Sequence, residues 1–212
     1  MGHETSIETA ADLRTGELLD QVQGVFAAKG FEKASMQDLA QAANMSAGNF
    51  YRYFPSKDAI IEALVQRVLS ALEARFRSIM TAADPMAALR ETLDGRMNPN
   101  VCEESALWSE IVAAANRRAD VGEMILRLEE TLTEYLVTVF GRVAGLDAGA
   151  AHERFHAHAS LIFMLIQGIK MRRRDDAADF TRLRALTLRI IDDLLEDISR
   201  AAAPATLQTG SL

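Results

Sequence analysis

The stretch Ser35–Lys57, SMQDLAQAANMSAGNFYRYFPSK, contains the signals that decide the fold of this chain. Ser35 is followed three residues later by Asp38, which is a capping-box-like pair at the start of a helix. This helix is predicted to run from Met36 to about Ala43 and to be broken by Asn44, because Asn is the residue after Gly that best tolerates the positive φ of a tight turn. Ser46 is predicted to cap a second short helix. We therefore expect two short helices joined by a tight turn, which is a helix-turn-helix.

The second short helix is predicted to have one buried apolar face. Phe50 and Phe54 are four residues apart, so they share one side of the helix. The residues between them would project outward, and a helix-turn-helix presents its second helix to the major groove of DNA. Pro55 ends the helix, and Ser56 is predicted to cap the long helix that follows.

Residues 18–64 resemble the N-terminal DNA-binding domain of the TetR family of bacterial transcriptional regulators. Four segments, FAAKGF, SMQDLA, MSAGNFYRYF and PSKDAI, occur in the order and spacing of that family. The main departure is Asn44, where the family usually has Gly, and the tolerance of Asn for positive φ makes this substitution mild. The resemblance implies DNA contacts at the matching positions, which are Ser35, Gln37, Ser46, Ala47, Gly48, Asn49, Tyr51, Arg52, Tyr53 and Lys57.

The chemistry of these residues suits the roles that the resemblance implies. Gly48 lets the backbone approach DNA closely. Tyr51 and Tyr53 offer hydroxyls to phosphates, and Arg52 can reach a guanine or the DNA backbone. Lys57 lies in the first turn of a helix, where an ammonium and backbone N–H groups together favour a phosphate. The alternative is that the tyrosines only pack against the protein and that Arg52 is a solvated charge.

The composition is that of an ordinary globular protein. Hydrophobic residues make up 49% and charged residues 25%, and the low aromatic content of 6% with four prolines favours an all-helical chain. The single cysteine, Cys102, excludes an internal disulfide and fits a cytoplasmic protein. The polar N-terminus and short apolar runs predict neither a signal peptide nor a membrane span. The net charge of −7 disfavours nucleic acid as a partner, but residues 44–57 contain two basic residues and no acid.

We expect an all-α fold of about nine helices in two domains. Besides the two short helices, helical periodicity covers residues 15–29, 56–80, 86–97, 103–118, 121–144, 149–173 and 179–200. The predicted domains are a disordered lead at 1–13, a helix-turn-helix DNA-binding domain at 14–58, an effector-binding and dimerisation domain at 59–200, and a flexible tail at 201–212. The helix at 56–80 would join the two domains.

The last two predicted helices carry apolar arcs wider than a surface helix needs. The helix at 179–200 has two offset apolar stripes. In the helix at 149–173, additional apolar residues beside the main stripe widen the apolar face in the same way. Two such helices are candidates for a four-helix bundle between two subunits, and the alternative is a single-chain core. The predicted dimer-interface residues are Phe155, Ile162, Ile166, Leu183, Leu186, Ile190 and Leu194.

The resemblance also implies that a small molecule binds within the C-terminal helices and changes the spacing of two DNA-binding heads. Candidate effector contacts are large or polar side chains on inferred inner faces, and the alternative for each is plain core: Met97, Trp108, Ile111, Phe140, Phe155 and His158. Their mostly apolar character points to an apolar or aromatic effector. The hypothesis is a homodimeric repressor that binds a palindromic double-stranded DNA operator and is released by this effector. The alternatives are a DNA-binding factor without a small-molecule switch, and a helical ligand-binding protein that has lost its DNA affinity.

Metal binding and catalysis have little support in the sequence. His152 and His156 are four residues apart and could share a helix face, as metal ligands do. No CxxC, HExxH or acidic cluster accompanies them, so no metal site and no cofactor are expected. The sequence also has no Gly-rich phosphate loop, nucleophile elbow or carboxylate pair of defined spacing, so we expect no enzyme.

Overall fold

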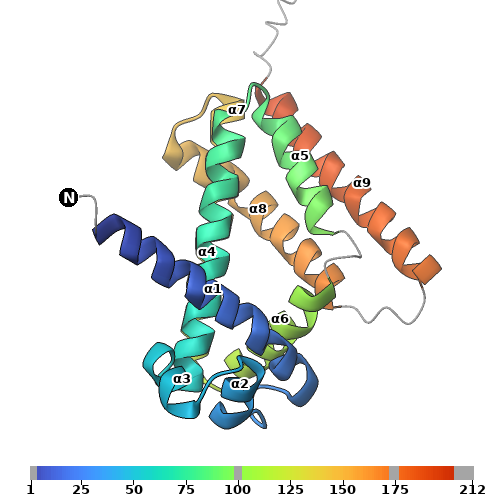
Figure 1. The fold of residues 1–212 in the computed structure, drawn as a ribbon. Helices are drawn as coiled ribbons and strands as arrows, with labels where there is room; N and C mark the ends of the chain where they lie inside the picture. The colour runs from blue at the N-terminus through green and yellow to red at the C-terminus, as the bar shows by residue number, and fades with distance from the viewer. Residues whose placement is uncertain (1–3, 98–101, 172–176, 203–212) are drawn as a thin grey trace, which may run out of the picture. The chain divides into compact units, whose positions relative to one another are not determined.

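The computed structural model describes residues 4–97, 102–171 and 177–202, and every regular element in these ranges is a helix (Figure 1). The helices are α1 (Glu4–Lys29), α2 (Met36–Ala42), α3 (Ala47–Tyr53), α4 (Lys57–Thr81), α5 (Pro85–Arg96), α6 (Cys102–Ala115), α7 (Ala119–Ala144), α8 (Ala148–Met171) and α9 (Ala177–Ala202). The prediction of an all-α fold with nine helices is confirmed for the described residues. Of the predicted tail, residues 203–212 lie outside them.

The first helix begins earlier than expected. It starts at Glu4, whereas the sequence pattern predicted a start near Thr15 after a disordered lead. Residues 4–13 contain neither Gly nor Pro and include Glu, Ala and Leu, so their propensity allows the helix to continue toward the N-terminus. Within the described ranges, no helix combines the length and apolarity that a membrane crossing requires.

The helices form two compact units that are not continuous in sequence. Unit 1 consists of Met1–Ala71 with Val101–Leu128, and unit 2 of Leu72–Asn100 with Glu129–Leu212. This division differs from the expected boundary at residues 58/59, because Ile111, Ala114 and Val121 pack into the core of unit 1. Helices α4 and α7 each contribute residues to both units.

Unit 1 is built on α1, which contacts both α2 and α6. Its inward-facing side is fully buried at Leu18, Val22 and Phe26, which follow helical spacing. Gly30 follows α1 and has a positive φ of 77°. The ring of Phe31 then folds back against α1, with its centroid 5.2 Å from the centroid of the Phe26 ring. This left-handed cap turns the chain toward α2.

Unit 2 contains α5, α8 and α9 with the later parts of α4 and α7. Its core includes an edge-to-face pair, in which the ring centroids of Phe140 and Phe155 are 6.1 Å apart. Helices α7 and α8 approach closely at Gly141, where an added Cβ would lie 2.7 Å from the Cβ of Ala151. Helix α9 contacts α5 and α8 and buries Leu195 completely.

Candidate nucleic-acid interface

The start of α2 is fixed by a network of hydrogen bonds around Ser35. The Ser35 hydroxyl accepts a bond from the Asp38 N–H at 3.1 Å, and the Asp38 carboxylate accepts one from the Ser35 N–H at 3.0 Å, so the predicted capping box is confirmed. Lys29 also pairs with Asp38 at 2.7 Å. The Lys29 bond, followed by the two Ser35 bonds, holds the pKa of Asp38 well below its usual range. A DNA contact by Ser35 would have to share a hydroxyl already used for capping.

The turn between α2 and α3 has the predicted backbone geometry. Asn44 adopts φ of 51°, the left-handed conformation for which Asn was expected. The Met45 N–H donates to the Ala40 carbonyl at 2.9 Å and closes the end of α2. Ser46 then caps α3, and its hydroxyl accepts a bond from the Asn49 N–H at 3.4 Å. Local hydrogen bonds and the backbone conformation of Asn44 thus join α2 to α3 in a tight turn.

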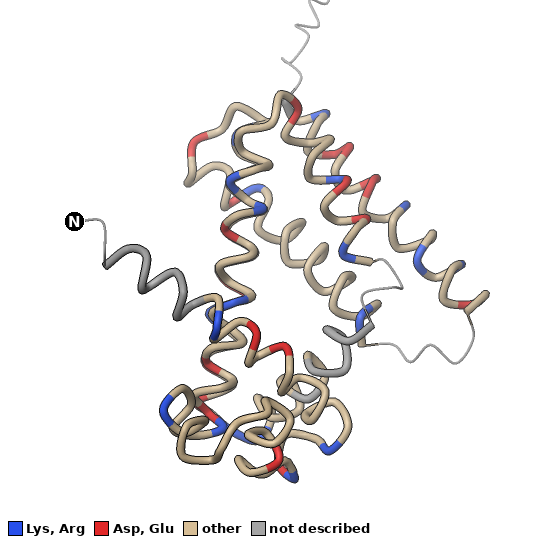
Figure 2. Tube along the Cα trace, viewed as in Figure 1, with Lys and Arg blue, Asp and Glu red and all other residues tan. Residues whose placement is uncertain are grey.

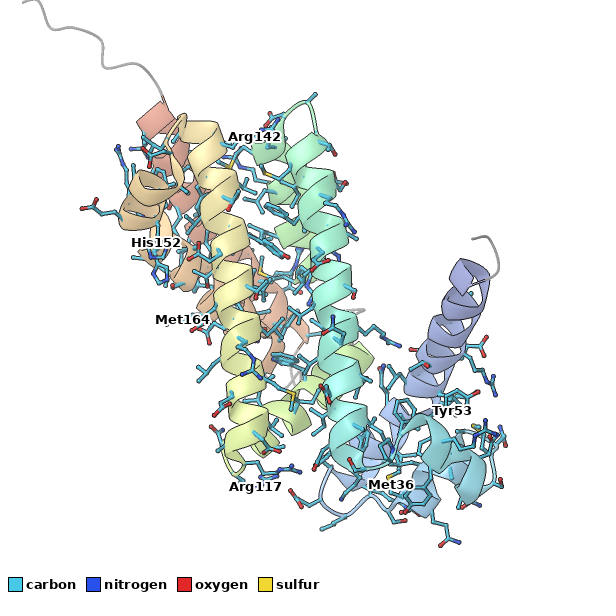
Figure 3. The ribbon with its side chains drawn as sticks, turned by 90° about the vertical axis from the view of Figure 1, so that its left-hand side faces the viewer. Met36, Tyr53, Arg117, Arg142, His152 and Met164 are labelled. Carbon is cyan, nitrogen blue, oxygen red and sulfur yellow. The ribbon has the colours of Figure 1, made fainter. Side chains whose placement is uncertain are left out.

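Helix α3 is amphipathic, with its phenylalanines buried and its remaining side chains exposed. Phe50 and Phe54 are 0% and 2% exposed and lie 5.4 Å apart between ring centroids. Tyr51 and Tyr53 remain 48% and 39% exposed, although a tyrosine ring would normally bury more of its surface. Figure 3 shows Tyr53 on this helix. The structure therefore brings most of the predicted DNA contacts onto one small exposed region, namely Ser46, Ala47, Gly48, Asn49, Tyr51, Arg52 and Tyr53.

The charge around α3 suits an anionic partner better than the net charge of the chain suggests. Residues 44–57 contain Arg52 and Lys57 and no acidic residue, and the distribution of charge along the chain can be followed in Figure 2. Helix α9, by contrast, carries acidic residues mainly in its second half, at Asp192, Asp193, Glu196 and Asp197. A locally basic helix surface is sufficient for contact with phosphates, but few phosphates would be neutralised per subunit.

Lys57 has a structural role that the sequence did not predict. Its ammonium donates to the carbonyls of Phe31 and Glu32, each at 3.0 Å, and lies 5.1 Å from the centroid of the Phe31 ring. Lys57 thereby joins the start of α4 to the loop between α1 and α2. Two of its three protons are used in this way, so the predicted phosphate contact would depend on the third.

Arg118 forms a second connection to the start of α4 within unit 1. Its guanidinium donates to the carboxylate of Asp58 at 2.5 Å and to that of Asp120 at 2.6 Å. The Arg118 hydrogen bond is the main reason that the pKa of each carboxyl lies below its usual value. No sequence pattern pointed to the Arg118–Asp58 pair, because the two residues are 60 positions apart.

The predicted effector residues fall into both cores. Trp108 and Ile111 pack in the core of unit 1, whereas Met97, Phe140 and Phe155 lie in the core of unit 2. His158 makes an edge-to-face contact with Phe155, with centroids 5.8 Å apart. Two of these residues have a buried nitrogen without a hydrogen-bond partner, namely Nε1 of Trp108 and Nδ1 of His158.

The predicted dimer-interface residues also separate into two groups. Phe155 and Ile162 are 2% and 0% exposed and belong to the core of unit 2 within a single chain. Leu186 and Ile190 of α9 are 50% and 38% exposed. The other three, Ile166, Leu183 and Leu194, are partly buried against the same core.

Comparison with known proteins places the helix-turn-helix in a described family. Residues 18–64 match the family described as "Bacterial regulatory proteins, tetR family". The HTH-type transcriptional regulator UidR of Escherichia coli (strain K12) is 26% identical over 131 residues, which are 62% of this chain and 66% of UidR. The HTH-type transcriptional repressor KstR2 of Mycobacterium tuberculosis (strain ATCC 25618 / H37Rv) is 33% identical over 78 residues, which are 36% of this chain and 39% of KstR2. The matches therefore span less than two thirds of the length of either relative.

Similarity of the fold extends much further along the chain. The structure of Salmonella enterica GusR aligns with a TM-score of 0.68 at 25% identity and covers 86% of this chain and 95% of that chain. A TetR transcription regulator from Haloarcula marismortui aligns with a TM-score of 0.67 at 17% identity, which supports the fold alone. The predicted arrangement of an N-terminal helix-turn-helix followed by a helical C-terminal region is thus confirmed.

Proposed function

We propose that this chain, which belongs to the TetR family of bacterial transcriptional regulators, represses transcription by binding a roughly palindromic operator as a dimer. The family is one of regulators and not of enzymes. The observation that supports DNA binding is the surface of α3, where Tyr51, Arg52 and Tyr53 are exposed above two buried phenylalanines. A helix held in this way enters the major groove by its N-terminal residues.

The proposed dimer rests on large apolar side chains that a single chain leaves exposed on α8 and α9. Leu161, Met164 and Met171 of α8 are 38%, 61% and 51% exposed and follow helical spacing along one face. Leu186 and Ile190 of α9 add to them, and α8 and α9 contact each other. Figure 3 shows Met164 projecting outward from α8. An exposed apolar surface of this kind is typical of a protein interface, and a second copy of the chain could cover it by two-fold symmetry.

The proposed effector site lies among the helices of unit 2. His158 has a buried Nδ1 without a hydrogen-bond partner, beside the aromatic ring of Phe155. An unpaired buried nitrogen is unfavourable by about 1–3 kcal/mol, so a ligand that donates to it or accepts from it would gain binding free energy. An apolar or aromatic effector with one polar group fits this environment. To release DNA, it must bind more tightly to the form of the dimer that does not fit the operator.

DNA binding can be tested by a gel shift with the DNA upstream of the gene for this protein, and with duplexes selected from a random pool. The expected result is a discrete complex that weakens as salt increases, because bound phosphates release counterions. Arg52→Ala should lower the affinity by roughly tenfold, the effect of losing a charged hydrogen bond. Arg75→Ala removes the same charge from the exposed surface of α4 in unit 2 and should leave the affinity unchanged. Failure to enrich any duplex would contradict the proposal.

A further inference from the structure

Three side chains with metal-binding atoms meet on the surface of unit 2. They are Glu134 of α7 and the pair His152 and His156 of α8, and one potential ligand atom from each lies within 4.8 Å of the other two. The Nδ1 atom of His152 is 2.9 Å from a carboxylate oxygen of Glu134. The two imidazole rings are 4.7 Å apart between centroids and tilted by 42°.

The positions of these residues follow from buried packing between α7 and α8. The close approach at Gly141 and the Phe140–Phe155 contact fix the two helices against each other. His152 directly follows the buried Ala151, and His156 directly follows the buried Phe155, so the backbone of both histidines is held in place. In Figure 3, His152 projects from the outside of this helix pair.

An ion pair between His152 and Glu134 explains only part of this arrangement. That pair would form without His156, whose ring nevertheless lies on the same side of α8, one helical turn further along. Two imidazole nitrogens and one carboxylate oxygen are ligands that borderline divalent transition metals prefer, whereas Ca²⁺ and Mg²⁺ prefer oxygen ligands alone. The donor set is that of a three-ligand zinc site with an open position for water.

We propose that Glu134, His152 and His156 bind a divalent transition-metal ion such as Zn²⁺ and thereby tie α7 to α8. Zinc ligands lie about 2.0–2.2 Å from the ion, which places two ligand atoms roughly 3–3.5 Å from each other. The facing atoms of His152 and Glu134 are already 2.9 Å apart, and all three donors lie within 4.8 Å of one another, so only small movements are needed to enclose an ion. The side chains of His152 and Glu134 are 52% and 53% exposed, and His156 is also exposed. Rotation about their side-chain bonds can therefore bring the donors together without repacking the core.

The proposal can be tested by calorimetric titration of the DNA-free protein with ZnCl₂, together with thermal unfolding with and without the metal. The expected result is one Zn²⁺ per chain and a higher melting temperature, because the ion binds the folded form. His156→Gln should lower the affinity by at least about tenfold, the smallest loss seen when supporting groups of metal sites are changed. Co²⁺ should give visible absorption bands with the wild type that this variant lacks.

Glu153→Gln is the matched control, because Glu153 lies between the two histidines on α8, is exposed and is not part of the cluster. It should bind Zn²⁺ as the wild type does. All of these variants change exposed side chains, so circular dichroism should show the same fold in each. Absence of Zn²⁺ binding by the wild type at millimolar metal would overturn the proposal. So would equal affinity in the wild type, His152→Gln and His156→Gln, since the ion would then be held elsewhere. DNA binding is not part of the measurement, so its outcome is independent of the proposed repressor function.

Discussion

Gly48 is the residue at which the proposed DNA contact and the stability of the free protein make opposite demands. It lies in α3, and a Cβ added there would meet nothing within 4 Å. An alanine should therefore stabilise α3, since glycine in a helix is unfavourable by roughly 0.5–1 kcal/mol relative to alanine. The proposed interface needs the backbone of α3 to approach DNA at this point, and an added methyl group would prevent it.

Gly48→Ala is accordingly expected to raise the free energy of unfolding slightly while lowering the affinity for DNA. The two effects can be measured by urea unfolding and by titration of a labelled operator. Gly24→Ala is the control, because Gly24 lies within α1, is exposed and also has nothing within 4 Å of an added Cβ. It should raise stability by a similar amount and leave DNA affinity unchanged. Equal DNA affinity in Gly48→Ala and the wild type would remove Gly48 from the interface.

Several residues of the helix-turn-helix could be predicted from the sequence because their roles depend on near neighbours. Ser35 caps α2 through a residue three positions away, and Asn44 takes the positive φ that its own side chain tolerates. The partners of Lys57, and the pairing of Arg118 with Asp58, could not be predicted in the same way. The two residues that Lys57 binds are at least 25 positions away from it in sequence, and Asp58 and Arg118 are 60 positions apart. Only the folded chain brings these residues together.

At the scale of the elements, the ion pairs of Arg118 with Asp58 and Asp120 make the attachment of α4 to the α6–α7 turn depend on pH. The pKa of Asp58 is lowered in the folded protein, so its interaction with Arg118 contributes stability at pH values above the unfolded pKa of about 3.9. That contribution is lost as the pH falls and the carboxylate becomes protonated. Arg118→Ala should destabilise the protein by roughly 1 kcal/mol at neutral pH, since Asp58 is 48% exposed and water screens the pair.

The measurement is urea unfolding of the wild type and Arg118→Ala at neutral pH and near pH 3, where the difference between them should be smaller. Arg117→Ala is a suitable control, because the neighbouring Arg117 is more exposed and reaches Glu32 only at 3.9 Å. It should change stability little at either pH. A difference between Arg118→Ala and the wild type that does not depend on pH would show that Arg118 acts through packing and not through its charge.

The helix pair α7–α8 depends on a small residue at its closest approach. Gly141→Ala would place a methyl group 2.7 Å from the Cβ of Ala151, so one helix must shift. Overpacking of this kind is expected to destabilise the protein by about 1–3 kcal/mol, in spite of the better helix propensity of alanine. Thermal unfolding measures the change, and a melting temperature equal to or above that of the wild type would show that the two helices separate easily.

Periodicity could not decide which apolar stripe of α9 faces its own chain. Both stripes have helical spacing, and each would serve equally well as the inner face. The structure buries Ile191 and Leu195 and leaves Leu186 and Ile190 exposed. The choice depends on where α5 and α8 lie, and the sequence of α9 contains no information on their positions. For the same reason the sequence did not suggest Glu134 as a neighbour of His152.

At the scale of the whole molecule, the exposed stripe predicts that dimerisation and folding can be separated by mutation. Ile190→Asp should give a folded monomer near 23.3 kDa, because a charge at the proposed interface would be desolvated on association but remains in water in the single chain. Light scattering after gel filtration measures the mass. Leu126→Asp makes the same change at an exposed leucine of α7 and should leave the dimer intact. A dimer that persists in Ile190→Asp would contradict the proposed interface.

Because unit 1 is formed by two segments that are separate in sequence, its helix-turn-helix cannot be replaced by recombination at a single position. The core beneath the helix-turn-helix includes Ile111, Ala114 and Val121, which come from α6 and α7. A single recombination junction after α4 would combine the helix-turn-helix of another protein with the α6 and α7 of this chain. Their side chains would not match, so cavities or clashes would form in the core of unit 1. A chimaera with transplanted operator preference should therefore need matched replacements in residues 101–128 as well. The proposed DNA-binding surface of α3 would therefore be inherited together with residues 101–128, which lie far from it in sequence.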